Sequence, residues 1–188
     1  MPKTIHTMRV IAGKHRRRRL KSVPAETTRS TRDRVKESLF NMLEPLEQYT
    51  RCLDLFAGSG ALGIEALSRG VEQAVFVESH TIAYAVLREN IEQLELLSQS
   101  ELNQVDALTY CRHDAASFDL ILLDPPYQSG LIDKVLELIC DRNLLKKQGL
   151  IAILSARQAK FSVPPCLTEI KQRAMGVTTV TLLRGDDA

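Results

Sequence analysis

Short apolar runs alternate with segments of helical spacing through the middle of the chain, and this alternation limits the possible folds more than any other feature. Runs without polar interruption are typical of strands buried on both faces of a parallel sheet. Between them, apolar residues recur every three or four positions, as they do on one face of a helix. Because strand–helix–strand crossovers are right-handed, the pattern predicts a doubly wound, mostly parallel α/β sheet. The predicted strands are Cys52–Phe56, Ala74–Glu78, Leu102–Val105, Phe118–Leu123 and Leu150–Leu154.

The two ends of the chain have other patterns. Pro164 and Pro165 interrupt the chain, and Leu167–Arg173 and Val177–Leu183 then alternate between polar and apolar residues. This alternation predicts a closing antiparallel strand pair. Residues 31–43 carry apolar residues at helical spacing and predict an amphipathic helix before the first strand.

The formal net charge of +2 hides an uneven distribution. Residues 1–36 hold 12 Lys and Arg but only two acids, whereas the rest of the chain holds 13 bases and 21 acids. A basic leader on an acidic body indicates a polyanionic partner. Met8, Val10 and Ala12 alternate with polar residues before a Gly13–Lys14 turn, which predicts a small basic β-hairpin. A disordered tail is the alternative, but such a tail would not need the apolar residues Val10, Ile11, Leu20 and Val23.

Composition narrows the class of protein. The chain is 44% hydrophobic and 26% charged, which excludes fibrous and wholly disordered classes. Its four cysteines are widely spaced without a C-x-x-C motif, so we expect reduced thiols in a cytoplasmic protein. The His and Cys residues lack metal-ligand spacing, so we expect no metal. The apolar runs are too short to cross a bilayer, and no signal peptide is visible. We expect a monomer that does not bind a membrane.

A glycine-rich segment follows the first predicted strand. Gly58, Gly60 and Gly63 satisfy G-x-G-x-x-G, and Glu78 follows twenty residues after the first of them, at the end of the next strand. In this context the glycines let a ligand approach the backbone, and the acid binds a ribose diol. The combination favours a nucleoside site over the alternative, a tight turn that binds no ligand.

Two further acids bear on which nucleoside is bound. Asp54 ends the first strand, where a pyrophosphate would require a region free of anions. An acid there suits a cationic ligand such as S-adenosylmethionine. Asp106 follows the third strand, and two roles are open for it. It could hydrogen-bond the adenine amine, or it could cap a helix at Ala107–Cys111.

The strongest single motif is Asp124-Pro125-Pro126-Tyr127, directly after the fourth strand. A rigid strand exit with a surface tyrosine is the purely structural interpretation. Its position at the carboxyl end of a strand next to the glycine strand favours a chemical role. The Asp124 carboxylate and the Pro125 carbonyl could accept N–H bonds from an amine on a base ring, and Tyr127 could stack on an extruded base. Stiff prolines would keep these acceptors oriented.

The tetrapeptide resembles that of amino-directed nucleic-acid methyltransferases. From about Met8 through Leu183, the chain is similar to the bacterial 16S rRNA (guanine-N(2))-methyltransferase family. The similar segments are MRVIAGKHRRRRL at the start, TRDRVKESLFNML at 31–43, LDLFAGSGALGIEALSRG at 53–70, Glu78 at its strand end and DPPY at 124–127. The segments at 31–43 and 53–70 are the most specific, because adenine methyltransferases share DPPY.

The resemblance implies a Rossmann-like, seven-stranded sheet and methyl transfer from S-adenosylmethionine to the N2 amine of a guanine in 16S rRNA. The partner would be the small ribosomal subunit or its assembly intermediate. The chain would divide into a basic RNA-contact hairpin, residues 1–30, and a methyltransferase domain, residues 31–188. By position, the catalytic residues would be Asp124, Pro125, Pro126 and Tyr127. The cofactor-binding residues would be Asp54, Phe56, Gly58, Ser59, Gly60, Glu78, Asp106 and Ala107. The RNA-binding residues would be Arg16, Arg17, Arg18, Arg19, Arg29, Arg32 and Arg34.

The chain departs from the family pattern at a few positions. Ala12 stands where the family usually has Gly, Ser30 where it has Pro, and His80 where it often has an acid. The last strand, Val180–Leu183, lacks the usual aromatic residue. These departures concern the hairpin and the substrate-side loop more than methyl transfer.

Three alternatives stay open. An adenine-amine methyltransferase on RNA or DNA would use the same DPPY motif, although a DNA enzyme would need a separate sequence-reading domain. A non-catalytic RNA-binding assembly protein would not need Asp124 or the paired prolines. An NAD(P) oxidoreductase is disfavoured by Asp54 and by the lack of a substrate domain.

Overall fold

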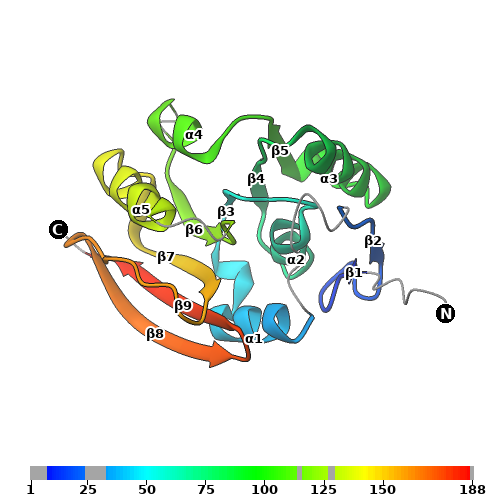
Figure 1. Cartoon of the computed structure of the whole chain (residues 1–188). Coiled ribbons are helices and arrows are strands. Elements are labelled where there is room, and N and C mark those ends of the chain that lie inside the picture. The colour runs from blue at the N-terminus through cyan, green and yellow to red at the C-terminus, as the bar shows by residue number, and fades with distance from the viewer. Residues whose placement is uncertain (1–7, 24–32, 114–115, 127–129, 187–188) are drawn as a thin grey trace.

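A seven-stranded sheet runs through the molecule, with helices on both of its faces (Figure 1). The computed structural model describes residues 8–23, 33–113, 116–126 and 130–186. The strand order is β5-β4-β3-β6-β7-β9-β8, in which β3 to β7 are parallel and β9 is antiparallel to both β7 and β8. The predicted doubly wound sheet with a closing antiparallel pair is therefore confirmed. The strands are β3 (Arg51–Asp54), β4 (Gln73–Val77), β5 (Ser100–Asn103), β6 (Phe118–Leu123), β7 (Leu145–Ala156), β8 (Leu167–Met175) and β9 (Thr178–Gly185).

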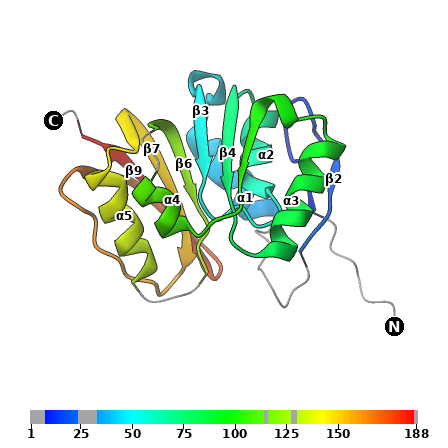
Figure 2. The same ribbon diagram turned by 90° about the horizontal axis from the view of Figure 1, so that it is seen from above.

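The helices form two layers, which Figure 2 shows on either side of the strands. One apolar cluster packs the first face of the sheet against α1, α2 and α3, and a second packs the other face against α4 and α5. Successive residues of β3 show why its sequence is continuously apolar, since Cys52 lies in the first cluster and Leu53 in the second. The helices are α1 (Asp33–Leu43), α2 (Ala61–Ser68), α3 (Thr81–Gln93), α4 (Ala107–His113) and α5 (Leu131–Asp141), with short 3-10 helices at Leu46–Gln48 and Leu97–Gln99.

One strand extends well beyond its predicted bounds. β7 begins at Leu145, where it pairs with Phe118 of β6, and not at the predicted Leu150. The intervening residues Lys146 and Lys147 are exposed, so this part of the strand lacks the apolar run on which the prediction rested. Among the described residues, no helix combines the length and the apolar character that crossing a membrane requires.

The expectation of four reduced cysteines is wrong for two of them. Cys140, in the last turn of α5, and Cys166, just before β8, form a disulfide with their Cα atoms 6.3 Å apart. They are 26 residues apart in sequence, so only the packing of α5 beside the segment that leads into β8 brings them together. Cys52 and Cys111 are buried free thiols.

The basic leader forms an ordered hairpin over the described residues 8–23. Its strands β1 (Met8–Arg9) and β2 (Arg19–Leu20) are antiparallel, with Met8 opposite Leu20. Met8, Val10 and Leu20 are buried in the same cluster as α2 and α3. The hairpin interpretation is confirmed, and Val10 and Leu20, two of the apolar residues that favoured it, help to dock it on the body.

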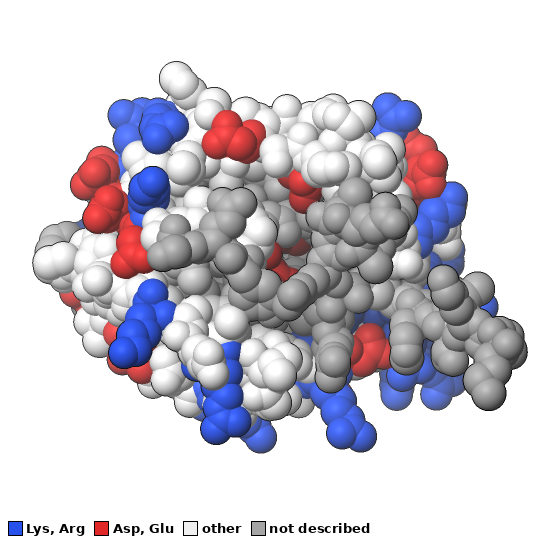
Figure 3. Space-filling view, viewed as in Figure 1, with Lys and Arg blue, Asp and Glu red and all other residues white. Residues whose placement is uncertain are grey.

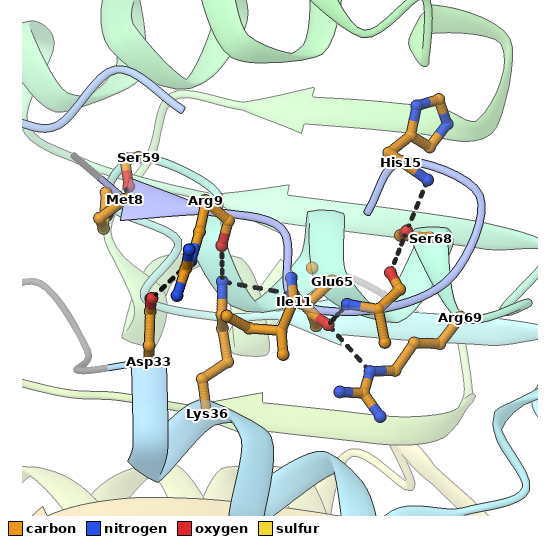
Figure 4. A network of polar contacts seen from close by, with 12 residues as sticks. Met8, Arg9, Ile11, His15, Asp33, Lys36, Ser59, Glu65, Ser68 and Arg69 are labelled. Carbon is orange, nitrogen blue, oxygen red and sulfur yellow. Dashed lines mark hydrogen bonds and ion pairs between the residues drawn. The ribbon is translucent and has the colours of Figure 1, made fainter. Parts of the chain in front are cut away.

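A buried polar network, shown in Figure 4, joins the hairpin to α1 and α2. Glu65 of α2 is fully buried and accepts hydrogen bonds from the backbone N–H groups of Ile11 at 2.8 Å and Ala12 at 3.0 Å. The Lys36 ammonium of α1 lies 3.3 Å from Glu65 and donates to the Arg9 carbonyl at 2.6 Å. Burial lowers the pKa of Lys36, and the Glu65 carboxylate opposes that shift. The hairpin is thus part of the folded body.

Candidate active site

Three carboxylates lie at the same edge of the sheet, each at the carboxyl end of a strand. Asp54 is the last residue of β3, Glu78 directly follows β4, and Asp124 directly follows β6. Both β4 and β6 pair with β3 in parallel, so their ends meet where ligand crevices form in such sheets. Figure 3 views the molecule from this side and shows acidic atoms deep in a hollow near its centre. The structure therefore brings together these three predicted site residues.

The glycine segment between β3 and α2 has the backbone geometry that its glycines permit. Gly58 and Gly60 have φ angles of 56° and 84°, in the left-handed region. A Cβ atom on Gly58 would meet nothing within 4 Å, so the space above this residue is open to a ligand. Gly63 serves packing instead, because a Cβ atom there would lie 2.3 Å from the ring of Phe76.

Glu78 holds the glycine segment in place. One of its carboxylate oxygens accepts the Gly58 N–H at 2.8 Å, and the other accepts the His80 N–H at 2.7 Å. Each oxygen has a second lone pair, so the carboxylate can accept further hydrogen bonds from a ligand. The acid that the sequence assigned to a ribose therefore also orders the loop beneath it.

Asp54 is a buried carboxylate with one free acceptor. Its Oδ2 accepts the Gly63 N–H at 2.9 Å, whereas its Oδ1 is buried without a hydrogen-bond partner among the described residues. Burial raises the pKa of Asp54 to about 7, and the nearby Asp124 and Glu78 carboxylates add to the shift. An unpaired buried acceptor among like charges is costly, and a cationic ligand would relieve that cost.

The role of Asp106 in the structure is to cap a helix. Its Oδ1 accepts the Thr109 N–H at 3.0 Å at the start of α4, which confirms the capping interpretation. The Thr109 hydrogen bonds also lower the pKa of Asp106. Ala107, the first residue of α4, is buried. The predicted contacts of Asp106 and Ala107 with a cofactor stay predictions.

The described part of the DPPY motif projects from the end of β6. Asp124 is half-buried, Pro125 is buried and Pro126 is exposed. This puts one side-chain acceptor at the edge of the hollow with a rigid proline behind it. Tyr127 lies outside the described residues.

Sequence reasoning missed one residue that ties the glycine segment to the hairpin. Asn90 of α3 is fully buried and donates to the Ser59 carbonyl at 2.9 Å and to the Lys21 carbonyl at 3.0 Å. Its oxygen accepts the Lys21 N–H at 2.8 Å. The available signal was a polar residue at a buried helical position, three residues after Leu87 and next to Ile91. Of the other predicted cofactor residues, Phe56 is half-buried and Ser59 is buried.

The predicted RNA-binding arginines do not all lie near the hollow. Arg16 to Arg19 are exposed on the hairpin, and Arg34 is exposed in the first turn of α1. The tip of the hairpin contacts the far end of α2, where the Lys14 and His15 N–H groups donate to Ser68 at 2.7 and 3.0 Å. An eight-residue helix such as α2 spans about 12 Å, so this tip is that far from the glycine segment. Arg29 and Arg32 lie outside the described residues.

Comparisons with known proteins agree on one family. A family model described as Conserved hypothetical protein 95 matches residues 8–184. The ribosomal RNA small subunit methyltransferase D of Haemophilus influenzae is 35% identical, over 93% of this chain and 92% of its own length. The Escherichia coli protein of the same name is 34% identical, over 79% of this chain and 74% of its own. The solved structure of yhhF from Escherichia coli has a TM-score of 0.87 at 28% identity, over 97% of this chain and 99% of that one.

Proposed function

Because the chain belongs to the Conserved hypothetical protein 95 family, we propose that it methylates ribosomal RNA of the small subunit. Two relatives that match most of its length are named for that activity. The methyl donor is S-adenosylmethionine, and the acceptor is the exocyclic N2 amine of a guanine in 16S rRNA. The observation that carries the proposal is the gathering of Asp54, Glu78 and Asp124 at neighbouring strand ends around a glycine segment.

The residues of this edge fit S-adenosylmethionine, whose sulfonium supplies an already activated methyl group. The free Oδ1 of Asp54 suits a positively charged donor, and the open space above Gly58 admits it close to the backbone. Glu78 keeps lone pairs for ribose hydroxyls while its N–H partners hold it still. The acidity of this edge distinguishes it from a pyrophosphate site, which would need donors and cations.

Asp124 is the residue to which we assign the acceptor base. An amine conjugated to a base ring is a weak nucleophile because its lone pair is delocalised into the ring. When the Asp124 carboxylate and the Pro125 carbonyl accept hydrogen bonds from the two N–H groups of this amine, the lone pair of its nitrogen would turn toward the methyl group. Catalysis then comes from orientation and fixed dipoles. The neighbouring Tyr127 would stack on the extruded base.

Radiolabelled methyl transfer with nucleoside analysis tests the proposal. Substrates are small-subunit particles from cells that lack this enzyme, the naked 16S rRNA and double-stranded DNA. The expected product is N2-methylguanosine in 16S rRNA. Methyladenosine would overturn the guanine assignment and support the adenine alternative. Tight cofactor binding without transfer to any of these substrates would favour a non-catalytic assembly protein.

A further inference from the structure

A second group of exposed cations lies on the side of the hollow away from the hairpin. We call Arg157, Lys160, Lys171 and Arg173 the basic rim. All four side chains are exposed, and none of them makes a hydrogen bond or an ion pair with another described residue. Figure 3 shows Lys and Arg side chains below the hollow on this face of the molecule. Cations that lack protein partners are free to meet anions from outside.

The sheet register places the basic rim at the same edge as Asp124. β6 and β7 are parallel, so Arg157 and Lys160, which follow β7, emerge at the carboxyl edge. The Arg157 N–H donates to the Val177 carbonyl at 2.8 Å, which ties this turn to the β8–β9 turn.

Arg173 on β8 lies in the same row of the sheet as Asp124, which follows β6. It pairs with Val180 of β9, which pairs with Leu154 of β7, one row beyond the Leu123–Ile153 pair. Asp124 follows Leu123 directly, so it occupies that same row. With strands about 4.8 Å apart, β8 lies about 14 Å from β6. Lys171 is two residues back along β8 on the same face as Arg173.

The charge of this segment contrasts with that of the body. Residues 156–177 contain four Lys and Arg and one acid, Glu169, whereas the remainder of residues 37–188 contains nine Lys and Arg and 20 acids. Asp133 of α5, an acid on an element that contacts this segment, accepts the Ser162 N–H at 2.8 Å. A local basic patch on an otherwise acidic body is the electrostatic footprint of a polyanion site.

The hairpin tip supplies cations on one side of the hollow only, and the basic rim supplies them on the other side. The tip arginines lie beside the far ends of α2 and α3, where the Arg18 guanidinium donates to the Gln93 carbonyl at 3.2 Å. An RNA whose base enters the hollow must carry its neighbouring phosphates across the carboxyl edge on both sides. We propose that the basic rim binds the phosphate backbone of that RNA on the side opposite the hairpin. This inference rests on the proposed function.

Paired substitutions test the basic rim. The variants are Arg157→Ser with Lys160→Ser, and Lys171→Ser with Arg173→Ser. The matched control is Arg112→Ser with Arg142→Ser, which removes the same charge from exposed positions at the ends of α4 and α5. Binding of 16S rRNA and of small-subunit particles is measured between 50 and 200 mM salt. Each rim pair is expected to reduce the slope of log affinity against log salt by about 1.4, since each phosphate contact contributes about 0.7 on a single strand.

The outcomes separate the basic rim from the proposed function. Supporting results are flatter salt slopes and at least about tenfold weaker RNA binding for the rim pairs at low salt, with cofactor affinity and thermal stability unchanged. Salt slopes equal to those of the wild type and of the control pair would overturn the inference, even if the wild type methylates 16S rRNA normally. A wild type that neither binds nor methylates 16S rRNA would instead refute the proposed function.

Discussion

At the scale of single residues, the most informative group is a carboxylate that is unfavourable without a ligand. Asp54 is buried beside two other acids, its pKa is raised to about 7, and its Oδ1 has no partner among the described residues. The sequence predicted the position and the cationic preference of this residue, because an acid at the end of a strand before a glycine loop is visible as a pattern. It could not predict the hydrogen bond to Gly63 or the free oxygen, because both depend on how α2 packs.

The raised pKa of Asp54 predicts a pH-dependent affinity for S-adenosylmethionine. Below about pH 7 the carboxyl is protonated and neutral, and above it the carboxylate attracts the sulfonium. Affinity for S-adenosylmethionine should therefore rise as pH increases from 6 to 8. Affinity for S-adenosylhomocysteine, which lacks the sulfonium charge, should rise less. Isothermal titration at several pH values measures both affinities. In Asp54→Asn, the affinities for the two ligands should depend on pH to the same extent.

The same titration affects folding stability with a defined sign. Between the unfolded pKa of 3.8 and the folded value of about 7, the native state binds more protons at Asp54 than the unfolded state does. The contribution of this group to stability is therefore fully present below about pH 4 and is lost as pH rises toward 7. For ligand binding, the role given to Asp54 would be contradicted if the affinities for S-adenosylmethionine and S-adenosylhomocysteine changed equally with pH.

Substitution of Asp124 separates catalysis from cofactor binding. Asp124→Ala should lower kcat for methyl transfer by at least about 100-fold, because it removes an acceptor from the reacting amine. Cofactor affinity should stay largely unchanged, because Asp54, Glu78 and the glycine segment, to which the cofactor is assigned, are all retained. Single-turnover transfer and equilibrium binding are the measurements. The exposed Asp141→Ala is the control, and parallel loss of transfer and binding in Asp124→Ala would refute the assignment.

At the scale of secondary-structure elements, most of the fold could be predicted and the way the hairpin docks could not. The predicted β6 agrees with the structure at both ends, because Phe118–Leu123 is apolar throughout. β7 was predicted too short, because its first residues are exposed and charged. The hairpin was predicted from alternation, but its attachment uses buried polar residues of distant elements, such as Glu65 and Asn90. Helical spacing beside Leu87 and Ile91 could have indicated that Asn90 is buried, but not which backbone groups it binds.

Asn90 provides a test of this attachment. Asn90→Ala leaves the Lys21 N–H, the Lys21 carbonyl and the Ser59 carbonyl without their partner and should lower the free energy of unfolding by about 2–4 kcal/mol. Cofactor binding should weaken as well, because Ser59 belongs to the glycine segment. The control is Gln93→Ala, which removes an exposed bond to the Arg19 carbonyl and should cost less than about 0.5 kcal/mol. Urea unfolding measures both, and equal effects would show that Asn90 does not anchor the hairpin.

At the scale of the whole molecule, acidic and basic residues lie in separate regions, and the net charge of +2 does not reveal this separation. An acidic hollow lies between a basic hairpin on one side and the basic rim on the other. The sequence revealed the first basic region because its charges are consecutive. The second depends on the register of β7, β8 and β9, which brings Arg157 and Arg173 to one edge from positions 16 residues apart.

Removing the hairpin charges should weaken RNA binding without affecting the cofactor. Replacement of Arg16, Arg17, Arg18 and Arg19 with Ser should reduce the salt slope of 16S rRNA binding by up to about 2.8, at about 0.7 per phosphate contact. S-adenosylmethionine affinity should be unchanged, because these side chains are exposed and the Arg18 guanidinium reaches the end of α3 at Gln93, not the glycine segment. Filter binding across a salt series is the measurement. An unchanged slope would mean that the hairpin tip does not contact RNA.

The docking of the hairpin also sets an order of events during synthesis. Residues 8–23 leave the ribosome before the body on which they dock, because their buried partners Glu65 and Asn90 are made more than fifty residues later. Until α3 is complete at Gln93, the apolar residues of the hairpin have no surface to pack on, and its arginines are carried on an unanchored chain. A nascent chain arrested before Gln93 should therefore be cleaved by protease within the leader, whereas one arrested after β9 should be protected there. The hairpin is thus translated before its docking surface and becomes structured only after that surface has formed.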